Sequence, residues 1–165
     1  LETERLILRT FNVGDAAFYY ALWKQASWIQ YIGDKKFRDV DDARESLING
    51  PMEMFSNKGF SLYLMTLKDN TPIGMCGLIK RDTLDDVDIG YGLLSAYEGK
   101  GYTLEAAKAV MDYAKNELHL KRIVAITTTD NQKSISLLEK IGMRYEKMVQ
   151  APNDDTELML FAAEV

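Results

Sequence analysis

A short glycine turn in front of a long helical segment is the part of this sequence best suited to bind a ligand. Gly99 and Gly101 flank Lys100, and the helical pattern begins at Tyr102. The first N–H groups of a helix have no partner within it, so a turn of this kind can hold an anion, and phosphate is the group we expect. The same glycines could also serve only to make a tight turn, and the spacing alone does not decide between the two.

Two common phosphate-binding motifs do not fit this turn. The P-loop requires Ser or Thr directly after Gly-Lys, where this chain has Gly101, and another glycine upstream, where it has Ser95. The dinucleotide-binding fingerprint requires a third glycine where Leu104 stands. We therefore expect neither a P-loop nucleotidase nor a dinucleotide-binding fold.

The strand-like segment before the turn, residues 87–94, carries two glycines on one face. Side chains alternate along a strand, so Gly90 and Gly92 share a face with Asp88 and leave it nearly bare. Glycine weakens a strand, which indicates that something approaches the backbone closely there. We expect either a thin, extended ligand with Asp88 at its far end, or a β-bulge or a closely packed helix.

Hydrophobic periodicity predicts the elements that position these residues. The expected strands cover residues 5–11, 60–68, 73–81, 87–94, 122–128, 143–150 and 157–163. The expected helices cover residues 15–25, 102–118 and 131–141, and one more helix begins between Asp39 and Asp42 and breaks at Asn49-Gly50-Pro51. Short turns join the second, third and fourth strands, which predicts an antiparallel meander.

The composition bounds the possible functions. A chain of 165 residues fits about one domain, and its net charge of −5 disfavours a nucleic-acid partner. One cysteine, Cys76, and one histidine, His119, exclude an internal disulfide and a Cys/His zinc site, so we expect a reducing, cytoplasmic compartment. There is no membrane-length apolar run and no signal peptide, and because the chain begins at Leu1 we expect that an initiator segment has been removed.

Five segments carry a family resemblance that extends over nearly the whole chain: residues 1–9, 88–91, 97–106, 120–123 and 131–142. The sequence resembles the GNAT superfamily of acetyl-CoA-dependent N-acetyltransferases, in particular its RimJ/RimL-like branch of protein N-terminal and small-amine acetyltransferases. The resemblance implies a single domain over residues 1–165 with a mixed α+β fold. A central, mostly antiparallel, twisted sheet of about seven strands is expected, splayed between the fourth and fifth strands and flanked by about four helices.

The resemblance also assigns the coenzyme site. The family's glycine loop holds the coenzyme A pyrophosphate through backbone N–H groups, its fourth strand pairs with the pantetheine arm, and an asparagine at a helix start contacts that arm. Asn131 could equally belong only to the cap of its helix. The residues assigned to the coenzyme are Tyr91, Gly92, Leu93, Leu94, Glu98, Gly99, Lys100, Gly101, Tyr102, Thr103, Asn131 and Ser134.

Two residues are implied as catalytic by their place in the family pattern. Asp88 stands where relatives often carry a glutamate base, but an aspartate of ordinary pKa is a weak base unless burial raises that pKa or a water relays the proton. Asp88 could instead attract the substrate ammonium, or be a solvated carboxylate at a strand end. Ser134 stands where RimL-like relatives place a hydroxyl near the leaving thiol, with Tyr91 among the alternatives. Trp28, Tyr31 and Phe37, together with Asp88, are the expected walls of the acceptor site.

Three residues depart from the family pattern. Glu98 and Thr103 replace the usual residues at the ends of the glycine loop, and Glu98 is unfavourable near an anion unless it points to solvent or pairs with Lys100. Leu138 stands where many relatives place a tyrosine acid.

The function expected from the sequence is therefore acetyl transfer from acetyl-CoA to a primary amine, a small molecule or a protein N-terminus. We expect no metal, nucleic acid or membrane partner, and a monomer or homodimer. The alternative is a coenzyme A-binding sensor without turnover.

Overall fold

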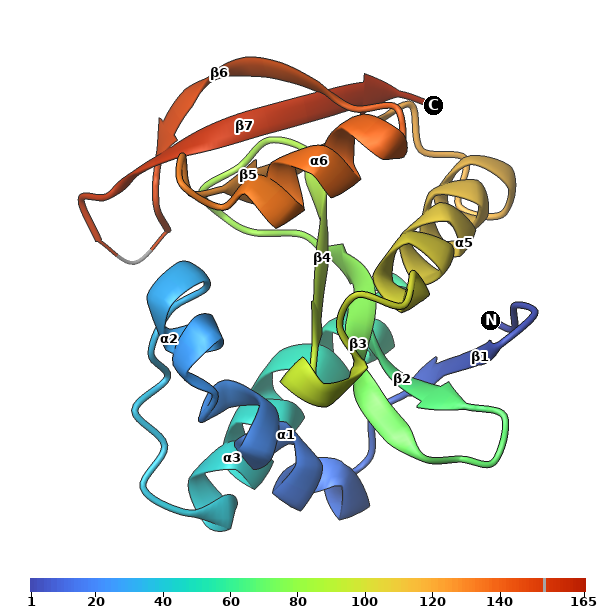
Figure 1. The fold of residues 1–165 in the computed structure, drawn as a ribbon, viewed down its shortest axis with the longest axis vertical. Coiled ribbons are helices and arrows are strands. Elements are labelled where there is room, and N and C mark those ends of the chain that lie inside the picture. Colours follow the sequence, from blue (N-terminus) through green and yellow to red (C-terminus); the bar gives the residue numbers. More distant parts are fainter. Residues whose placement is uncertain (153) are drawn as a thin grey trace.

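The strands of the chain form one twisted sheet in the order β1-β2-β3-β4-β5-β7-β6 (Figure 1). The computed structural model describes residues 1–152 and 154–165. The strands are β1 (Leu6–Thr10), β2 (Leu62–Leu67), β3 (Pro72–Ile79), β4 (Val87–Leu93), β5 (Arg122–Thr127), β6 (Arg144–Gln150) and β7 (Glu157–Glu164). The α-helices are α1 (Ala16–Trp23), α2 (Ala26–Tyr31), α3 (Val40–Leu47), α4 (Glu53–Lys58), α5 (Tyr102–Asn116) and α6 (Gln132–Lys140). The predicted mixed α+β fold with seven strands is confirmed.

The sheet divides between β4 and β5. All other neighbouring strands are antiparallel, whereas β4 and β5 are parallel and share only two residue pairs, Val87 with Ile123 and Asp88 with Val124. Beyond Asp88 the two strands diverge, as Figure 1 shows. The predicted splay between the fourth and fifth strands is confirmed, and it begins at Asp88.

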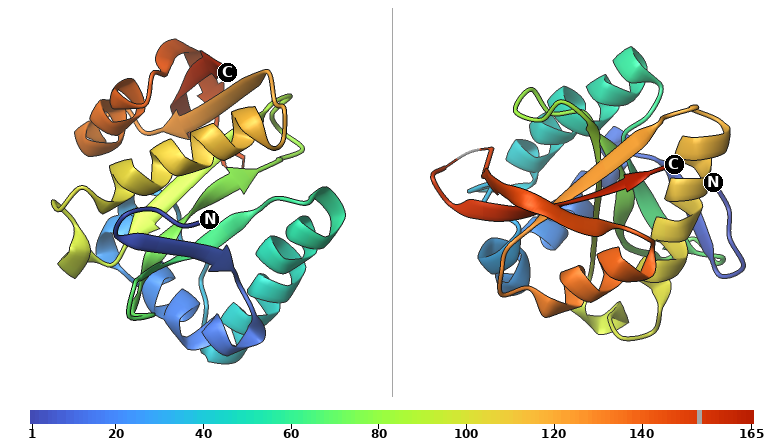
Figure 2. Two further views of the ribbon diagram at one scale, coloured as in Figure 1. Left: turned by 90° about the vertical axis from the view of Figure 1, so that its right-hand side faces the viewer. Right: turned by 90° about the horizontal axis from the view of Figure 1, so that it is seen from above.

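Helices lie on both faces of the sheet (Figure 2). Helix α5 packs on β3 and β4, and α6 packs on β5. On the opposite face, α1 and α3 pack against each other and bury Leu22 and Leu47 near Leu64 of β2 and Met75 of β3. No helix among residues 1–152 and 154–165 is long and apolar enough to span a bilayer.

Residues 40–58 form one continuous helical segment through the point where the sequence predicts a break. Helix α3 continues through Ile48–Met52 as a π-helical turn into α4, which ends at Gly59 in the left-handed conformation (φ 77°). The prediction of a break at Asn49-Gly50-Pro51 is wrong. The wider winding of a π-turn accommodates the ring and the missing N–H of Pro51, which a regular α-helix would not.

A second helical difference lies between the first two predicted helices, where the sequence predicts a loop. Residues 26–31 form α2, which has no side-chain cap at its start. Its only fully buried residue is Trp28, so packing of this indole, rather than a local start signal, holds the helix in place.

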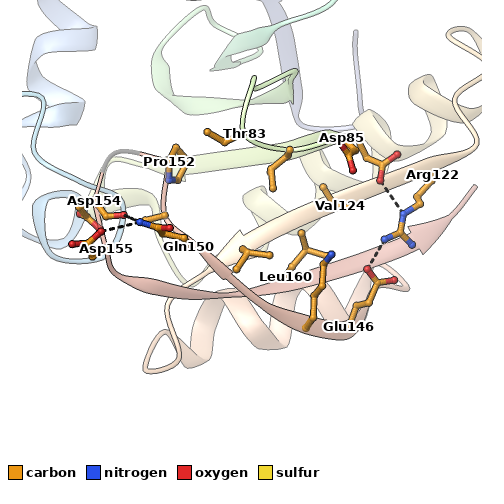
Figure 3. A pocket seen from close by; sticks show the side chains of 15 residues that line it. Thr83, Asp85, Arg122, Val124, Glu146, Gln150, Pro152, Asp154, Asp155 and Leu160 are labelled. Carbon is orange, nitrogen blue, oxygen red and sulfur yellow. Dashed lines mark hydrogen bonds and ion pairs between the residues drawn. The ribbon is translucent and has the colours of Figure 1, made fainter.

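The last two strands form a hairpin beside β5 (Figure 3). Strand β7 pairs with β5, which leaves β6 outermost. The pairing of β6 with β7 shifts register between Tyr145 and Lys147. Most side chains of β6 are exposed.

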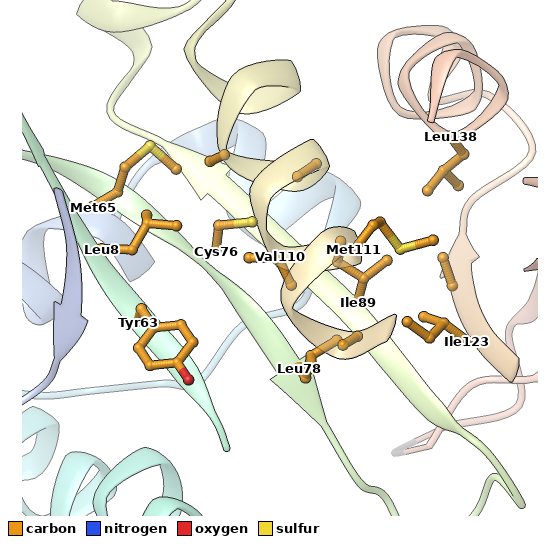
Figure 4. Packing of buried hydrophobic residues seen from close by; sticks show 14 of the residues in the cluster. Leu8, Tyr63, Met65, Cys76, Leu78, Ile89, Val110, Met111, Ile123 and Leu138 are labelled. Carbon is orange, nitrogen blue, oxygen red and sulfur yellow. The ribbon is translucent and has the colours of Figure 1, made fainter. Parts of the chain in front are cut away.

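A hydrophobic core joins the two halves of the splayed sheet (Figure 4). Val110 and Met111 of α5 lie in one cluster with Ile89 of β4, Ile123 of β5 and Leu138 of α6. Burying each such side chain contributes about 1.5–3 kcal/mol. Helix α5 therefore holds together the two strands whose own hydrogen-bonded pairing is short.

Candidate active site

The glycine turn has the conformation that exposes backbone donors. Gly99 and Gly101 have φ angles of 78° and 83°, a region that residues with a Cβ avoid, and Gly101 is the N-cap of α5. Because Gly101 has no side chain, the first turn of α5 receives no side-chain cap. Its free N–H groups can therefore bind an anionic ligand.

Glu98, at the start of this loop, does not pair with Lys100. Its carboxylate is exposed and lies 3.6 Å from Nζ of Lys133 on α6. The negative charge that the sequence places beside the anion site is therefore directed to solvent and partly neutralised by another element.

The edge of β4 that faces the splay carries unpaired backbone groups. The N–H of Leu94 donates to the carbonyl of Ile73 on β3, so the backbone groups of Leu93 and Tyr91 point the other way, toward the space that β5 has left. The Leu93 carbonyl already accepts from Nε1 of Trp28 and Nε2 of Gln25. The N–H of Leu93 and both backbone groups of Tyr91 thus line an open strand edge.

The bare face of β4 is covered by protein side chains at both glycines. A Cβ built on Gly92 would lie 2.2 Å from Cζ2 of Trp28, so the indole occupies the space that a side chain would fill. The expectation of an extended ligand on this face is wrong at Gly92, and the alternative of a closely packed helix, here α2, is confirmed. What β4 leaves free is its edge.

Asp88 lies at the start of the splay with its side chain almost fully buried, at 1% exposure for the residue. Its Oδ1 accepts from Nε of Arg81 at 3.1 Å. Burial raises the pKa of Asp88 to about 6, although the nearby Arg81 guanidinium acts in the opposite direction. The alternative that Asp88 is a solvated strand-end carboxylate is therefore wrong, and burial raises its pKa as a usable base requires.

A groove of about 660 Å³ lies on the Asp88 side of the sheet (Figure 3). Val124, the register partner of Asp88, lines it, and so does Asp86, which directly precedes β4, whereas Asp88 itself does not line it. One end holds Arg122, which bonds Asp86 and Glu146, and the other holds Gln150 bonded near the β6–β7 turn. The lining includes five carboxylates, from Asp85, Asp86, Glu146, Asp154 and Asp155, and two basic groups, from Arg122 and Lys147.

On the opposite side of β4, two hydroxyl groups meet. The Tyr91 hydroxyl and Oγ of Ser134 are 2.6 Å apart, and either can be the donor. Burial raises the pKa of Tyr91 to about 12, so this phenol stays protonated at neutral pH. Both residues are half-buried. The site thus has a carboxylate on one face of β4 and a hydroxyl pair on the other.

Asn131 has the capping role that the sequence left open. Its Oδ1 accepts from the backbone N–H of Ser134, which fixes the first turn of α6 and the position of the Ser134 hydroxyl. Leu138, where many relatives carry a tyrosine, is fully buried in the core and has no polar group to offer.

The three aromatic residues expected to form the acceptor wall lie in different environments. Trp28 and Phe37 are buried in the core between α1, α3 and the sheet, together with Tyr19 and Trp23. Tyr31, at the end of α2, is half-buried.

Two residues that shape the site, Arg81 and Gln25, are not predicted from the sequence. Arg81 pairs with Asp88, and Gln25 connects the end of α1 to the Leu93 carbonyl and to the N–H of Ser95. Period-two alternation places Asp88 and Arg81 in neighbouring strands, but nothing in the sequence singles out Arg81 as its partner. Gln25 has no signal in the sequence, because its partners lie about seventy residues away.

Comparison with known proteins agrees with this geometry. Residues 5–144 match the acetyltransferase (GNAT) domain family. The chain is 32% identical over 154 residues to the uncharacterized N-acetyltransferase p20 of Bacillus licheniformis, covering 91% of this chain and 85% of that protein. An acetyltransferase crystal structure from Agrobacterium tumefaciens superimposes with a TM-score of 0.85 at 25% identity, over 100% of this chain and 94% of that one.

The fold is also shared with RimL, a ribosomal L7/L12 α-N-protein acetyltransferase solved in complex with coenzyme A. That structure gives a TM-score of 0.84 at 17% identity over 99% of this chain and 96% of the RimL chain. The chain belongs to the GNAT acetyltransferase family and is an acyltransferase.

Proposed function

We propose that residues 1–165 form one acetyltransferase domain that transfers the acetyl group of acetyl-CoA to a primary amine. The observation that carries the proposal is that a carboxylate and a pair of hydroxyl groups lie on opposite faces of β4 at the splay. Asp88 lies on one face, where its register partner Val124 lines the groove, and the Tyr91–Ser134 pair lies on the other. An amine and a thioester that meet between these groups would have a proton acceptor and a hydrogen-bond donor on opposite sides.

In this proposal the coenzyme occupies the side of the glycine loop. Backbone N–H groups from Glu98 to Thr103 hold its diphosphate, and the free edge of β4 at Tyr91 and Leu93 pairs with the amide groups of its pantetheine arm. The Oδ1 of Asn131 is engaged by the Ser134 N–H, so its amide NH₂ is the part left to contact that arm. The Leu93 N–H, unpaired at the splay, is the oxyanion donor.

The reaction is a direct attack on the thioester. The amine nitrogen bonds to the carbonyl carbon, the carbon–sulfur bond breaks, and the products are an amide and coenzyme A. Asp88 accepts the proton of the attacking amine through a water, because its buried carboxylate leaves no room for direct contact. The Ser134 hydroxyl donates to the departing sulfur, and Tyr91 donates in turn to Ser134.

The acceptor enters from the groove on the Asp88 side. The excess of carboxylates there favours a cationic amine, and Tyr31 is the proposed remaining aromatic wall. RimL and the Escherichia coli [ribosomal protein uS5]-alanine N-acetyltransferase, which is 26% identical over 160 residues, make a protein N-terminus one acceptor to test. An α-amine, with its lower pKa, also demands less of Asp88 than a lysine-like amine does.

The first experiment is a calorimetric titration of the purified protein with acetyl-CoA, followed by thiol release across small amines and peptides. We expect saturable binding at one site and turnover with at least one primary amine. Asp88→Asn and Ser134→Ala should lower the turnover rate while binding persists. Failure of well-folded protein to bind acetyl-CoA would refute the proposal, and binding without turnover on any amine would favour a sensor.

A further inference from the structure

The side chain of Arg5, just before β1, reaches across to the glycine loop and the start of α5. Its Nη1 donates to the carbonyl of Lys100 at 3.0 Å, and its guanidinium lies 4.5 Å from the centre of the Tyr102 ring. The nearness extends to Gly101, where a built Cβ would lie 3.3 Å from Nη2 of Arg5. One side chain therefore contacts Lys100 and Tyr102 and lies close to Gly101 between them.

Glu105, in the first turn of α5, holds the Arg5 side chain in this position. Its Oε1 accepts from Nε of Arg5 at 2.7 Å, and its Oε2 accepts from the backbone N–H of Arg5 and from Oγ1 of Thr3. Figures 1 and 2 show the N-terminal segment running beside α5. The chain start is thus anchored to the helix that opens at the loop.

The hydrogen bond to the Lys100 carbonyl controls the direction of a loop donor. The carbonyl of Lys100 and the N–H of Gly101 belong to one planar, trans peptide group, in which the two bonds point in opposite directions. When Arg5 holds the carbonyl, the Gly101 N–H must point away from Arg5. Gly101, on one side of this peptide group, has no Cβ to restrict its φ angle, so without the hydrogen bond from Arg5 the group would rotate more freely.

We infer that Arg5 is a positioning residue for the coenzyme site: by holding the Lys100 carbonyl, it aims the Gly101 N–H at the diphosphate. This inference rests on the proposed use of coenzyme A. Arg5 acts through the peptide group, and a lysine cannot replace it, because one ammonium lacks the planar fork that bonds Glu105 and Lys100 together.

The test compares two acyl donors that differ in the diphosphate. We expect Arg5→Gln to raise the KM for acetyl-CoA roughly three- to tenfold, the range for one lost hydrogen bond, with kcat unchanged. S-acetylpantetheine has no diphosphate, so its kcat/KM should not change. Arg5→Lys should behave like Arg5→Gln.

Arg9→Gln is the matched control, because Arg9 follows four residues later on β1, forms an ion pair with Asp15 and has the same 43% side-chain exposure as Arg5. We expect it to leave both donors unaffected. An equal loss with both donors in the Arg5 variants, or a loss no greater than in Arg9→Gln, would overturn the inference.

Calorimetry keeps the test independent of turnover. Coenzyme A and pantetheine are titrated into the same variants, and only the affinity for coenzyme A should fall. If Arg5→Gln does not fold, Arg5→Lys carries the comparison. If the unmodified protein binds no coenzyme A, the proposed function itself is refuted, which distinguishes that failure from a failure of Arg5.

Discussion

Two opposing effects act on the pKa of Asp88. Its burial disfavours the charged carboxylate, and the ion pair with Arg81 favours it, with burial the stronger of the two. The pKa of about 6 leaves Asp88 ionised at neutral pH and still basic enough to take a proton. An exposed aspartate in the same place would be about two units less basic.

This balance predicts the acid side of the pH profile. Because Asp88 must be ionised to act as a base, kcat/KM should rise with pH through about 6 and then lose its dependence on this group. Arg81→Gln removes the charge that lowers the pKa, so the rise should move to higher pH. At each pH, kcat/KM of the wild type is divided by kcat/KM of Asp88→Asn, which cancels the ionisation of the amine substrate. A ratio that does not change around pH 6 would contradict the role of Asp88 as a base.

The same shift predicts an effect on stability. The folded-state pKa lies above the unfolded value near 3.9, so folded protein binds this proton more tightly. Asp88 therefore contributes most to stability below pH 4, and that contribution is lost as pH rises through about 6. The free energy of unfolding, measured with urea, should decrease as pH rises from about 4 to about 6, and Asp88→Asn should remove this decrease. An unchanged slope in the variant would mean that Asp88 titrates normally.

The hydroxyl pair predicts a loss confined to the chemical step. Ser134→Ala and Tyr91→Phe should each lower kcat about 10- to 100-fold, the range for one lost hydrogen bond to a charged group, because the leaving sulfur loses its hydrogen-bond donor or the support of that donor. Coenzyme affinity should stay the same. Ser136→Ala, an exposed serine on the same helix, is the control and should be silent. Comparable losses in all three variants would indicate a general effect on α6.

At the scale of elements, α2 determines which backbone groups stay free at the end of β4. Trp28 packs on Gly92, and its Nε1, with Gln25, occupies the Leu93 carbonyl. The helix thereby removes one backbone acceptor from the open edge and leaves the donor of the same residue. That selection is what an oxyanion site needs.

The contact with Trp28 predicts the cost of a single methyl group. Gly92→Ala places a Cβ inside the indole, so the free energy of unfolding should fall by about 1–3 kcal/mol. Gly50→Ala is the control, because that glycine is helical with open space around it, and its substitution should be neutral or stabilising. Chemical denaturation measures both. A neutral Gly92→Ala would show that α2 moves freely from the strand.

Much of the element order is predictable from the sequence. The strands and the long helix α5 follow from strict periodicity, and the family pattern places Asp88, Ser134 and the glycine loop. Helix α2 and the π-turn at Pro51 are not predictable in this way, because tertiary packing of Trp28 and relaxed winding decide them. The partners Arg81 and Gln25, and the Tyr91–Ser134 contact, depend on how distant segments meet in the folded sheet.

At the scale of the molecule, the splay separates two chemically different sides. The glycine loop on one side presents donors for an anion, whereas the groove on the other carries an excess of carboxylates within a chain of net charge −5. An anionic acetyl donor and a cationic amine acceptor would reach the site from opposite sides of the sheet, so neither would block the other.

Opposite charges predict opposite responses to salt. Screening should weaken attraction of a cationic acceptor to the groove and weaken repulsion of the anionic coenzyme by the whole chain. The acceptor KM should therefore rise with ionic strength, while the KM for acetyl-CoA should fall or stay constant. Replacing Asp154 and Asp155 with asparagine should reduce the acceptor effect alone. A parallel change in both KM values would contradict a charged groove.

The irregular outer strand β6 has a consequence for how copies of this protein behave in a crowded solution. The register shift between Tyr145 and Lys147 interrupts its regular pairing, and Arg144, Glu146 and Lys147 bring charge to the exposed border. A border of this kind makes a poor template for further strands. It protects the chain against fibril-like growth at the one end of the sheet where Tyr145 and Met148 would otherwise invite it.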